Sequence, residues 1–183
     1  AINPEGEERS YTMFQNTVTG TILNISNVTI QNAVPGDGGQ SGDEESSGAS
    51  EASVVYNKAE NAVVNLNNVT LKNNTGNAIY NTSILNVKGV IYNASRPDNN
   101  NNYIYNTSTG TVSVDVSDKN VANRTNGNIT NEGIFTIEKN ASLILESPAI
   151  FNNKSTTSKL NILGDLLLAD GSKLSINNGL TLV

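Results

Sequence analysis

The most constraining feature of this chain is a sequence motif that repeats in the same phase. Residues 22–32 (ILNISNVTIQN) align without gaps on residues 63–73 (VVNLNNVTLKN), and residues 84–93 (ILNVKGVIYN) follow after about one more period. A short apolar stretch that ends in asparagine also recurs, at Asn16, Asn57, Asn81, Asn106, Asn131, Asn152 and Asn177. From Asn57 onward, these asparagines are 24, 25, 25, 21 and 25 residues apart. A fixed period of this size indicates a repeat architecture in which each unit packs on its neighbours.

Each period contains short stretches of alternating polarity. Val112, Val114 and Val116 share one face of an extended segment, and Val64 with Leu66 repeats the pattern. No window shows a sustained helical periodicity, and glycine follows several of the landmark asparagines before the next strand. We therefore predict an all-β fold, a right-handed parallel β-helix of about six to seven coils of 21–25 residues. A β-sandwich is the alternative, because it also has short strands, although it need not repeat the same words in phase.

The domain organisation follows from the place where the repeat is interrupted. The step from Asn16 to Asn57 is 41 residues and contains the Gly/Ser-rich acidic stretch 35–50. We expect an N-terminal extension at 1–10 and one β-helix domain over 11–183, with an inserted loop at 33–53. The abrupt start at Ala1 and the alternation up to Val183 predict a piece of a longer chain, with more coils after Val183 and an unpaired strand edge at its end.

The many asparagines have a structural explanation in such a fold. Asparagine and glycine tolerate the positive φ that turns between short strands require. Where the same turn recurs at each level, an asparagine amide can bond the amide of the next coil and satisfy its polar atoms by stacking. We predict one ladder of Asn57, Asn81, Asn106 and Asn131, and place Asn68 and Asn73 in other turns. In residues 69–81, Val69, Leu71 and Ile79 should point inward and Gly76 should form the tightest point of a corner.

Composition excludes several function classes. The chain has no cysteine and no histidine, so a Ser-His-Asp triad, a Cys-His dyad, a thiolate metal site and a histidine-ligated metal cannot form within it. The net charge is −6 and basic runs are absent, which argues against nucleic-acid binding. No run reaches 18 apolar residues, so we expect no membrane span, and nothing indicates a cofactor.

The stretch VTLKNNTGNAIYN (69–81) resembles the repeat of chlamydial polymorphic outer-membrane proteins and related autotransporter passengers. That repeat pairs an F-x-x-N motif with G-G-A-I, which stands here as Gly76, Asn77, Ala78 and Ile79. The sequence departs from the family pattern, because Asn77 replaces the second glycine and no phenylalanine precedes the first motif. The resemblance implies an extracellular passenger at a bacterial cell surface that acts as an adhesin or self-associating module.

Some β-helices are polysaccharide lyases or hydrolases, so the carboxylates are candidate catalytic residues. Glycoside hydrolysis requires two positioned carboxylates, for which the chain offers Asp115, Asp118, Asp165 and Asp170. Asp115 should face solvent on a strand, whereas Asp118 and Asp170 lie in turn sequences. We therefore expect no enzyme activity and keep a polysaccharide-active enzyme as an alternative.

The inserted loop contains a second group of acidic residues. Asp37, Asp43, Glu44 and Glu45 are weak calcium candidates, because hard oxygen ligands suit Ca²⁺, but a solvated acidic loop explains them as well.

Sequons for N-glycosylation are the third candidate for chemistry. They are frequent, as expected by chance in a chain rich in Asn, Ser and Thr. Modification is expected only in exposed loops such as those at Asn93 and Asn123, because a laddered asparagine could not be modified without breaking its stack.

Partner binding is the remaining candidate function. The outward faces of a β-helix present many polar side chains, useful for glycans or proteins of a host or cell surface, or for lateral contacts between identical rods. The loops at 33–53 and 93–102 interrupt the repeat and are the candidate specificity elements, in particular Arg96, Asp98, Asn99 and Asn100. A structural stalk or filament module is the main alternative to an adhesin.

Overall fold

A computed structural model describes residues 12–33, 53–74, 76–94, 102–177 and 180–182. Within these ranges every regular element is a β-strand. The described part of the chain has no helix long and apolar enough to cross a membrane. The expected extension at 1–10 and most of the inserted loop at 33–53 lie outside the described residues.

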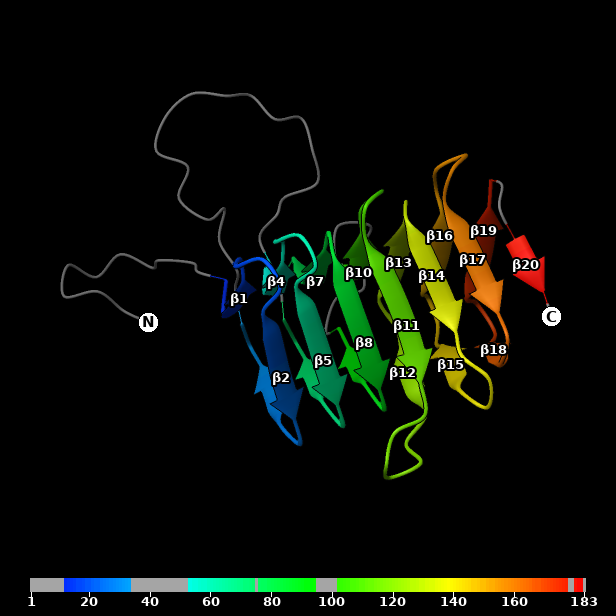
Figure 1. The fold of residues 1–183 in the computed structure, drawn as a ribbon. Coiled ribbons are helices and arrows are strands. Elements are labelled where there is room, and N and C mark those ends of the chain that lie inside the picture. Colours follow the sequence, from blue (N-terminus) through cyan, green and yellow to red (C-terminus); the bar gives the residue numbers. More distant parts are fainter. Residues whose placement is uncertain (1–11, 34–52, 75, 95–101, 178–179, 183) are drawn as a thin grey trace.

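The strands form three parallel sheets (Figure 1). The first sheet holds β1 (Phe14–Asn16), β4 (Ser53–Asn57), β7 (Asn77–Asn81), β10 (Asn102–Asn106), β13 (Asn128–Asn131), β16 (Ile150–Asn153) and β19 (Lys173–Ile176). The second holds β2 (Ile22–Ser26), β5 (Val63–Asn67), β8 (Ile84–Lys88), β11 (Thr111–Asp115), β14 (Ile134–Ile137), β17 (Lys159–Ile162) and β20 (Leu180–Leu182). The third holds β3 (Thr29–Gln31), β6 (Thr70–Lys72), β9 (Ile91–Asn93), β12 (Asn123–Thr125), β15 (Ser142–Leu145) and β18 (Asp165–Leu168).

Consecutive strands visit the three sheets in turn, so one strand from each sheet makes one coil. The first coil is β1, β2 and β3, and each later coil adds the next three strands to the same sheets. Every pairing is parallel, as in Asn57 opposite Asn81 and Leu66 opposite Val87. The prediction of an all-β, parallel, stacked solenoid is confirmed. Its handedness and the number of coils stay predictions of the sequence.

The core fills the interior between the three sheets. Inward positions alternate with outward ones along each strand, so Val64 and Leu66 are buried while Val63 and Asn65 are half-buried on the outer side. Two aromatic pairs thicken this core: Phe135 packs edge-on against Phe151 with ring centroids 4.9 Å apart, and Tyr92 stacks on Tyr103 at 5.3 Å. Burial of apolar side chains, worth about 25 cal/mol per Å², holds coil on coil because no single coil can bury its own face.

Asparagine and glycine form the turns between the sheets. Among the described residues, those with positive φ other than glycine are all asparagines, at Asn27, Asn32, Asn61, Asn68, Asn73, Asn120 and Asn140. The prediction that Asn68 and Asn73 belong to turns away from the ladder is therefore confirmed. Gly76 has a φ of 70°, and Val69, Leu71 and Ile79 are fully buried, so the corner predicted within residues 69–81 is also confirmed.

Two glycines lie at the corner between the first and second sheets, where an added Cβ would find no room. A Cβ on Gly133 would overlap the backbone oxygens of Gly110 and Thr107 in the previous coil, and a Cβ on Gly110 would overlap the side-chain amide of Asn106 in its own coil and come within 2.7 Å of the Asn81 carbonyl oxygen in the previous coil. Gly110 and Gly133 are therefore required by these close contacts and not by a positive φ, whereas Gly20, which follows Asn16, has a φ of 70° and open space around it.

The two ends of the stack present terminal strands. In each sheet the last described strand pairs on one side only, and these strands are β1, β2 and β3 at one end and β18, β19 and β20 at the other (Figure 1). Leu167 and Leu168 of β18 are about half exposed.

Candidate functional site

A buried asparagine ladder runs through the first sheet. Asn57 Nδ2 donates to Asn81 Oδ1 at 2.8 Å, Asn81 Nδ2 to Asn106 Oδ1 at 2.8 Å, and Asn106 Nδ2 to Asn131 Oδ1 at 2.8 Å. Asn131 Nδ2 continues the ladder to Asn153 Oδ1 at 2.7 Å. All five side chains have no exposed surface. The predicted ladder is confirmed and is one member longer.

The last member of the ladder differs from the landmark found in the sequence. The apolar word AIFN ends at Asn152, but the alternation in β16 places Phe151 and Asn153 inward and Asn152 outward. In the next coil Ile176 occupies the ladder position opposite Asn153. The choice of Asn152 as the equivalent landmark was therefore wrong by one residue, because two asparagines follow one another at that strand end.

Each ladder amide also closes the corner between the first and second sheets. Its second N–H donates to backbone carbonyls there, as Asn57 Nδ2 does to Ile84 O at 2.9 Å and Asn131 Nδ2 does to Lys159 O at 3.0 Å. These bonds satisfy amide N–H groups that would otherwise be buried without partners, whereas Asn57 Oδ1, at the start of the ladder, accepts no hydrogen bond from the described residues. The ladder is structural and inaccessible, so a ligand site has to lie on an outward face.

The outward face of the second sheet carries a polar hollow with a volume of about 530 Å³. It is lined by Asn24, Ser26, Asn65, Leu66, Asn67, Asn86, Lys88, Ser113 and Asp115. These residues come from β2, β5, β8 and β11, which are the second-sheet strands of the first four coils. The volume falls in the range of ordinary small-ligand sites, about 300–1,000 Å³.

A column of side-chain amides lies across the middle of the hollow. Asn65 Nδ2 donates to Asn24 Oδ1 at 2.8 Å, and Asn86 Nδ2 donates to Asn65 Oδ1 at 2.8 Å. Ser113 continues the column in β11, and beyond the hollow Asn161 continues it by donating to Thr136 at 3.2 Å. Unlike the buried ladder, this column borders solvent, and Asn24 is exposed. It presents polar groups at one-coil intervals along the rod.

The charges in the hollow balance each other. Lys88 Nζ lies 2.9 Å from the Asp115 carboxylate, and both side chains are roughly two-fifths exposed. The hydrogen bond from Lys88, the backbone N–H of Val116 and the lysine charge together hold the pKa of Asp115 below its usual value, although burial acts in the opposite direction. The hollow therefore offers one cation and one anion that are already paired.

A loop of residues 116–122, here named the clasp, borders the hollow. It connects β11 to β12, where the first three coils use only two residues between the corresponding strands, and it projects from the edge of the second sheet (Figure 1). Lys119 Nζ donates to Asn27 Oδ1 at 2.6 Å, and the Asp118 carboxylate accepts from Asn68 Nδ2 at 2.7 Å. Ser117 sits against Gly89, where an added Cβ would come within 2.7 Å of the serine Cβ.

The clasp and the hollow span the same coils. Asn27, Asn68 and Gly89 are the turn residues that directly follow the lining residues Ser26, Asn67 and Lys88. The clasp therefore runs along the border of the hollow from the fourth coil back to the first. A loop that bridges coils in this way departs from the usual rule that each repeat contacts only its neighbours.

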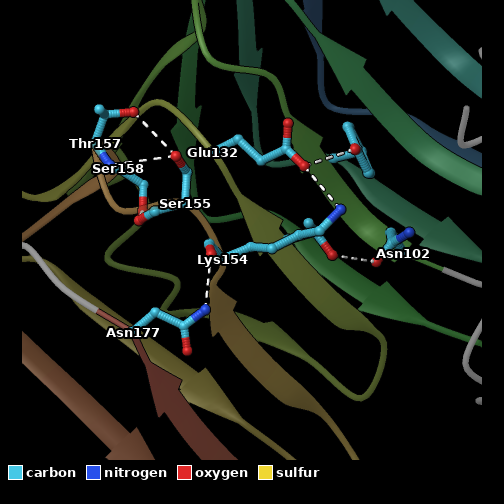
Figure 2. A network of polar contacts seen from close by, with 9 residues as sticks. Asn102, Glu132, Lys154, Ser155, Thr157, Ser158 and Asn177 are labelled. Atoms are coloured by element: carbon cyan, nitrogen blue, oxygen red, sulfur yellow. Dashed lines mark hydrogen bonds and ion pairs between the residues drawn. The ribbon is translucent and has the colours of Figure 1, made fainter.

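A second polar network lies on the first sheet (Figure 2). Glu132 accepts a hydrogen bond from the Tyr105 hydroxyl at 3.0 Å and pairs with Lys154 at 2.9 Å, and Asn177 Nδ2 donates to the Lys154 carbonyl at 2.7 Å. Burial, followed by the hydrogen bond to Glu132 and its charge, raises the pKa of Tyr105 to about 12. Figure 2 shows Glu132 beside Lys154, and Asn177 close to the main chain of Lys154.

Tyrosines form a column next to this network. Tyr80 stacks on Tyr105 with ring centroids 5.4 Å apart, and Tyr56 is tilted against Tyr80 at 5.6 Å. Because the rings cover one another along the rod axis, the face of Tyr80 is not available to stack on a ligand. The column thus reinforces the first sheet, and the hollow on the second sheet is the stronger candidate for a site.

The four carboxylates considered for glycoside hydrolysis have different surroundings in the fold. Asp115 pairs with Lys88, and Asp118 accepts from Asn68, which holds the pKa of Asp118 below its usual value. Asp165 begins β18 on the third sheet and Asp170 lies exposed in the turn after that strand. A general acid for glycoside hydrolysis needs a raised pKa, the opposite of what Asp115 and Asp118 show.

The remaining candidates from the sequence have separate outcomes. The calcium candidates Asp37, Asp43, Glu44 and Glu45 and the loop residues Arg96, Asp98, Asn99 and Asn100 lie outside the described residues. Among the residues that the structure does describe, no three His, Cys, Asp or Glu side chains gather as metal ligands do.

The expectation that Asn123 lies in an exposed loop was wrong. Asn123 begins β12, is 1% exposed, and holds the corner of its coil by accepting from the Val90 N–H at 2.9 Å and donating to Asp115 O at 3.1 Å. Asn93 is exposed, as expected, and accepts a hydrogen bond from Asn126. The prediction for Asn123 failed because the inserted residues come before Asn123. The clasp ends at Ala122, and the repeat resumes at the next residue.

Sequence reasoning missed both the hollow and the clasp, although signals for each were present. The words ILNIS, VVNLN and ILNVK place Asn24, Asn65 and Asn86 in phase, and the alternation turns them outward. The clasp is visible in the sequence as extra residues between two strand-forming stretches. Its contacts with Asn27 and Asn68 leave no trace in the sequence, because the partners are 92 and 50 residues away from the residues that they bind.

The chain was also compared with known proteins. No protein-family model matches the sequence, and neither curated proteins nor solved structures give a match. The fold and the geometry of the outward faces therefore carry the functional argument.

Proposed function

We propose that this chain is a non-catalytic binding module of a bacterial surface protein, with the right-handed coil of an autotransporter-like passenger. It acts in adhesion or self-association outside the cell. Its partner is a glycan or protein of a host or cell surface, or an identical molecule. The resemblance of residues 69–81 to passenger repeats supports the surface location.

The observation that carries the proposal is the hollow on the second sheet. It combines in-register amides and hydroxyls with a paired lysine and aspartate. Such a surface supplies many weak hydrogen bonds and no strongly activated group. Multivalent display then raises the avidity of each weak contact.

Adhesion of beads coated with the full chain tests this function. Beads are offered to cultured epithelial cells and to beads that carry the same chain. We expect adhesion or clustering that falls when Asn65→Leu and Asn86→Leu are combined, because the amide column is then lost. Asn161→Leu is the matched control, since Asn161 occupies the same column outside the hollow. Unchanged adhesion of the double variant would rule out the hollow as the contact.

A structural stalk or filament module is the second candidate. The continuous core and the buried ladder favour it, because they build a regular rod without any reference to a partner. This candidate predicts neither adhesion nor clustering above the level of uncoated beads. Removal of residues 36–50 tests separately whether the inserted loop contributes to binding.

A further inference from the structure

We propose that the hollow binds an extended, uncharged oligosaccharide that lies along the rod axis, with one sugar ring over each of the first four coils. This inference rests on the proposed function, because it names the partner of the same face.

The length of the hollow fits a short oligomer. Its lining residues come from four neighbouring strands, which at a strand spacing of about 4.8 Å extend over roughly 14 Å. In an extended sugar chain each ring advances by a length close to one strand spacing. A chain laid across the strands therefore repeats in step with Asn24, Asn65, Asn86 and Ser113.

The hydrogen-bonding groups of the amide column suit sugar hydroxyls. Each bond in the column uses one N–H and one oxygen lone pair, so a further N–H and a further lone pair remain on Asn65. At the ends of the column, within the described part of the chain, Asn24 Nδ2 donates to no residue and Asn86 Oδ1 accepts from none. The column thus offers donors and acceptors in alternation, which is what hydroxyl groups require.

An apolar row lies beside the amide column. Ile22, Val63 and Ile84 stand opposite one another in register, two residues before the column on the same outward face. Ile22 is 63% exposed, and the other two are half-buried. Sugar rings present C–H groups as well as hydroxyls, so an aliphatic row beside a polar column matches both parts of the ring.

The charge of the lining selects against charged polymers. Lys88 and Asp115 are the charged residues that line the hollow, and they neutralise each other at 2.9 Å. An acidic sugar would have to compete with Asp115 for Lys88, and a cationic chain would have to compete with Lys88 for Asp115. An uncharged chain leaves the ion pair intact.

The clasp closes one long side of the hollow. The clasp follows Asp115 directly in the sequence. It contacts Asn68 and Asn27, which directly follow the lining residues Asn67 and Ser26. A chain that crossed the sheet along the strands would run into this border. A chain along the rod axis would lie parallel to it, which sets the direction of the proposed ligand.

The first measurement uses an array of neutral and acidic oligosaccharides probed with the fluorescently labelled full chain. Neutral members that bind are then titrated by calorimetry at lengths from two to six rings. We expect affinity to rise with length up to about four rings and then to level off, because the hollow spans four coils. Binding of acidic members alone, binding of no member, or affinity independent of length would each overturn the proposal.

Two matched variants assign the binding to the hollow. We expect Asn65→Leu to weaken binding at least about tenfold, since each lost polar contact of about 1.4 kcal/mol corresponds to a factor of ten. Asn161→Leu should leave the affinity unchanged. Circular dichroism and thermal unfolding of both variants exclude misfolding as the cause. Equal effects of the two substitutions would contradict the proposal.

The bead assay separates this inference from the proposed function. If Asn65→Leu with Asn86→Leu removes adhesion while no oligosaccharide of the array binds, the partner is a protein and the oligosaccharide assignment is wrong, although the proposed function stands. If neither adhesion nor clustering occurs with the unaltered chain, the proposed function itself is wrong.

Discussion

Lys119 Nζ donates a hydrogen bond to Asn27 Oδ1 at 2.6 Å, although 92 residues separate the two in sequence. Together with the hydrogen bond from Asn68 to Asp118, this contact connects the fourth coil to the second coil and to the first coil. A solenoid usually frays from its ends, because each coil is held only by its neighbours. The clasp gives the first coil an additional attachment.

The first prediction concerns the stability of the first coil. Lys119→Met removes the charged donor but keeps a similar length, so the amides of β2 and β3 should exchange faster with solvent while those of β14 and β15 stay unchanged. Hydrogen exchange measured by mass spectrometry reports this difference. Lys139→Met, in the turn between β14 and β15, is the control. Equal exchange in β2 and β3 for both variants would show that the clasp does not hold the first coil.

The second prediction concerns acid. Hydrogen bonds from Asn68 to Asp118 and from Lys88 to Asp115 lower the pKa of each carboxyl in the folded state below its usual 3.8. Their stabilisation is present above that pH and is lost as pH falls through the lowered folded values. Asp118→Asn should therefore lower the thermal midpoint at neutral pH, and the difference from the unaltered chain should shrink below about pH 4. A difference that is constant with pH would contradict a role of the charge.

The third prediction concerns the buried ladder. Asn106→Ala leaves Asn81 and Asn131 without their amide partner and removes one donor from each of the Gly110 and Ile134 carbonyls. Because unsatisfied buried polar groups are costly, we expect a loss of about 3 kcal/mol in the free energy of unfolding. Asn152→Ala, on the outward side of the same sheet, should change it by less than about 0.5 kcal/mol. Urea unfolding measures both, and equal losses would mean that the ladder adds nothing.

The fourth prediction concerns the coil corner at Gly133. Gly133→Ala should destabilise the protein by at least about 2 kcal/mol, because its Cβ would overlap backbone oxygens of the previous coil, which have no alternative position. Gly20→Asn is the contrasting change. Gly20 has a φ of 70° and open space around it, and asparagine accepts that conformation. If the two substitutions were equally mild in urea unfolding, the close stacking at Gly133 would be wrong.

The fifth prediction concerns alkaline pH. Burial and Glu132 raise the pKa of Tyr105 from 10.0 to about 12. The folded state therefore holds this proton while the unfolded chain releases it, so the contribution of Tyr105 to stability declines as pH rises from 10 to about 12. The ultraviolet difference titration between the unaltered chain and Tyr105→Phe isolates this group. Glu132→Gln should move the pKa part of the way back towards 10.0, and an unchanged midpoint would exclude Glu132 as a cause.

The sequence by itself determined the architecture, because stacking makes the same demand at every level. The words around Asn57, Asn81, Asn106 and Asn131 predicted which amides meet, since residues in phase along a parallel solenoid become neighbours across coils. The alternation of Val64 and Leu66 likewise predicted which side chains fill the core. The double asparagine at Asn152 and Asn153 shows the limit of this reasoning, because only the strand pleat decides which of two adjacent residues points inward.

Tertiary structure alone decided the clasp and the border of the hollow. Periodicity relates a residue to its counterpart one coil away, but Lys119 reaches three coils back from an insertion that breaks the period. The same insertion explains why Asn123 is buried and not in an exposed loop. Contacts made by an irregular segment depend on where the regular part of the rod places its partners, and that position exists only once the coils have stacked.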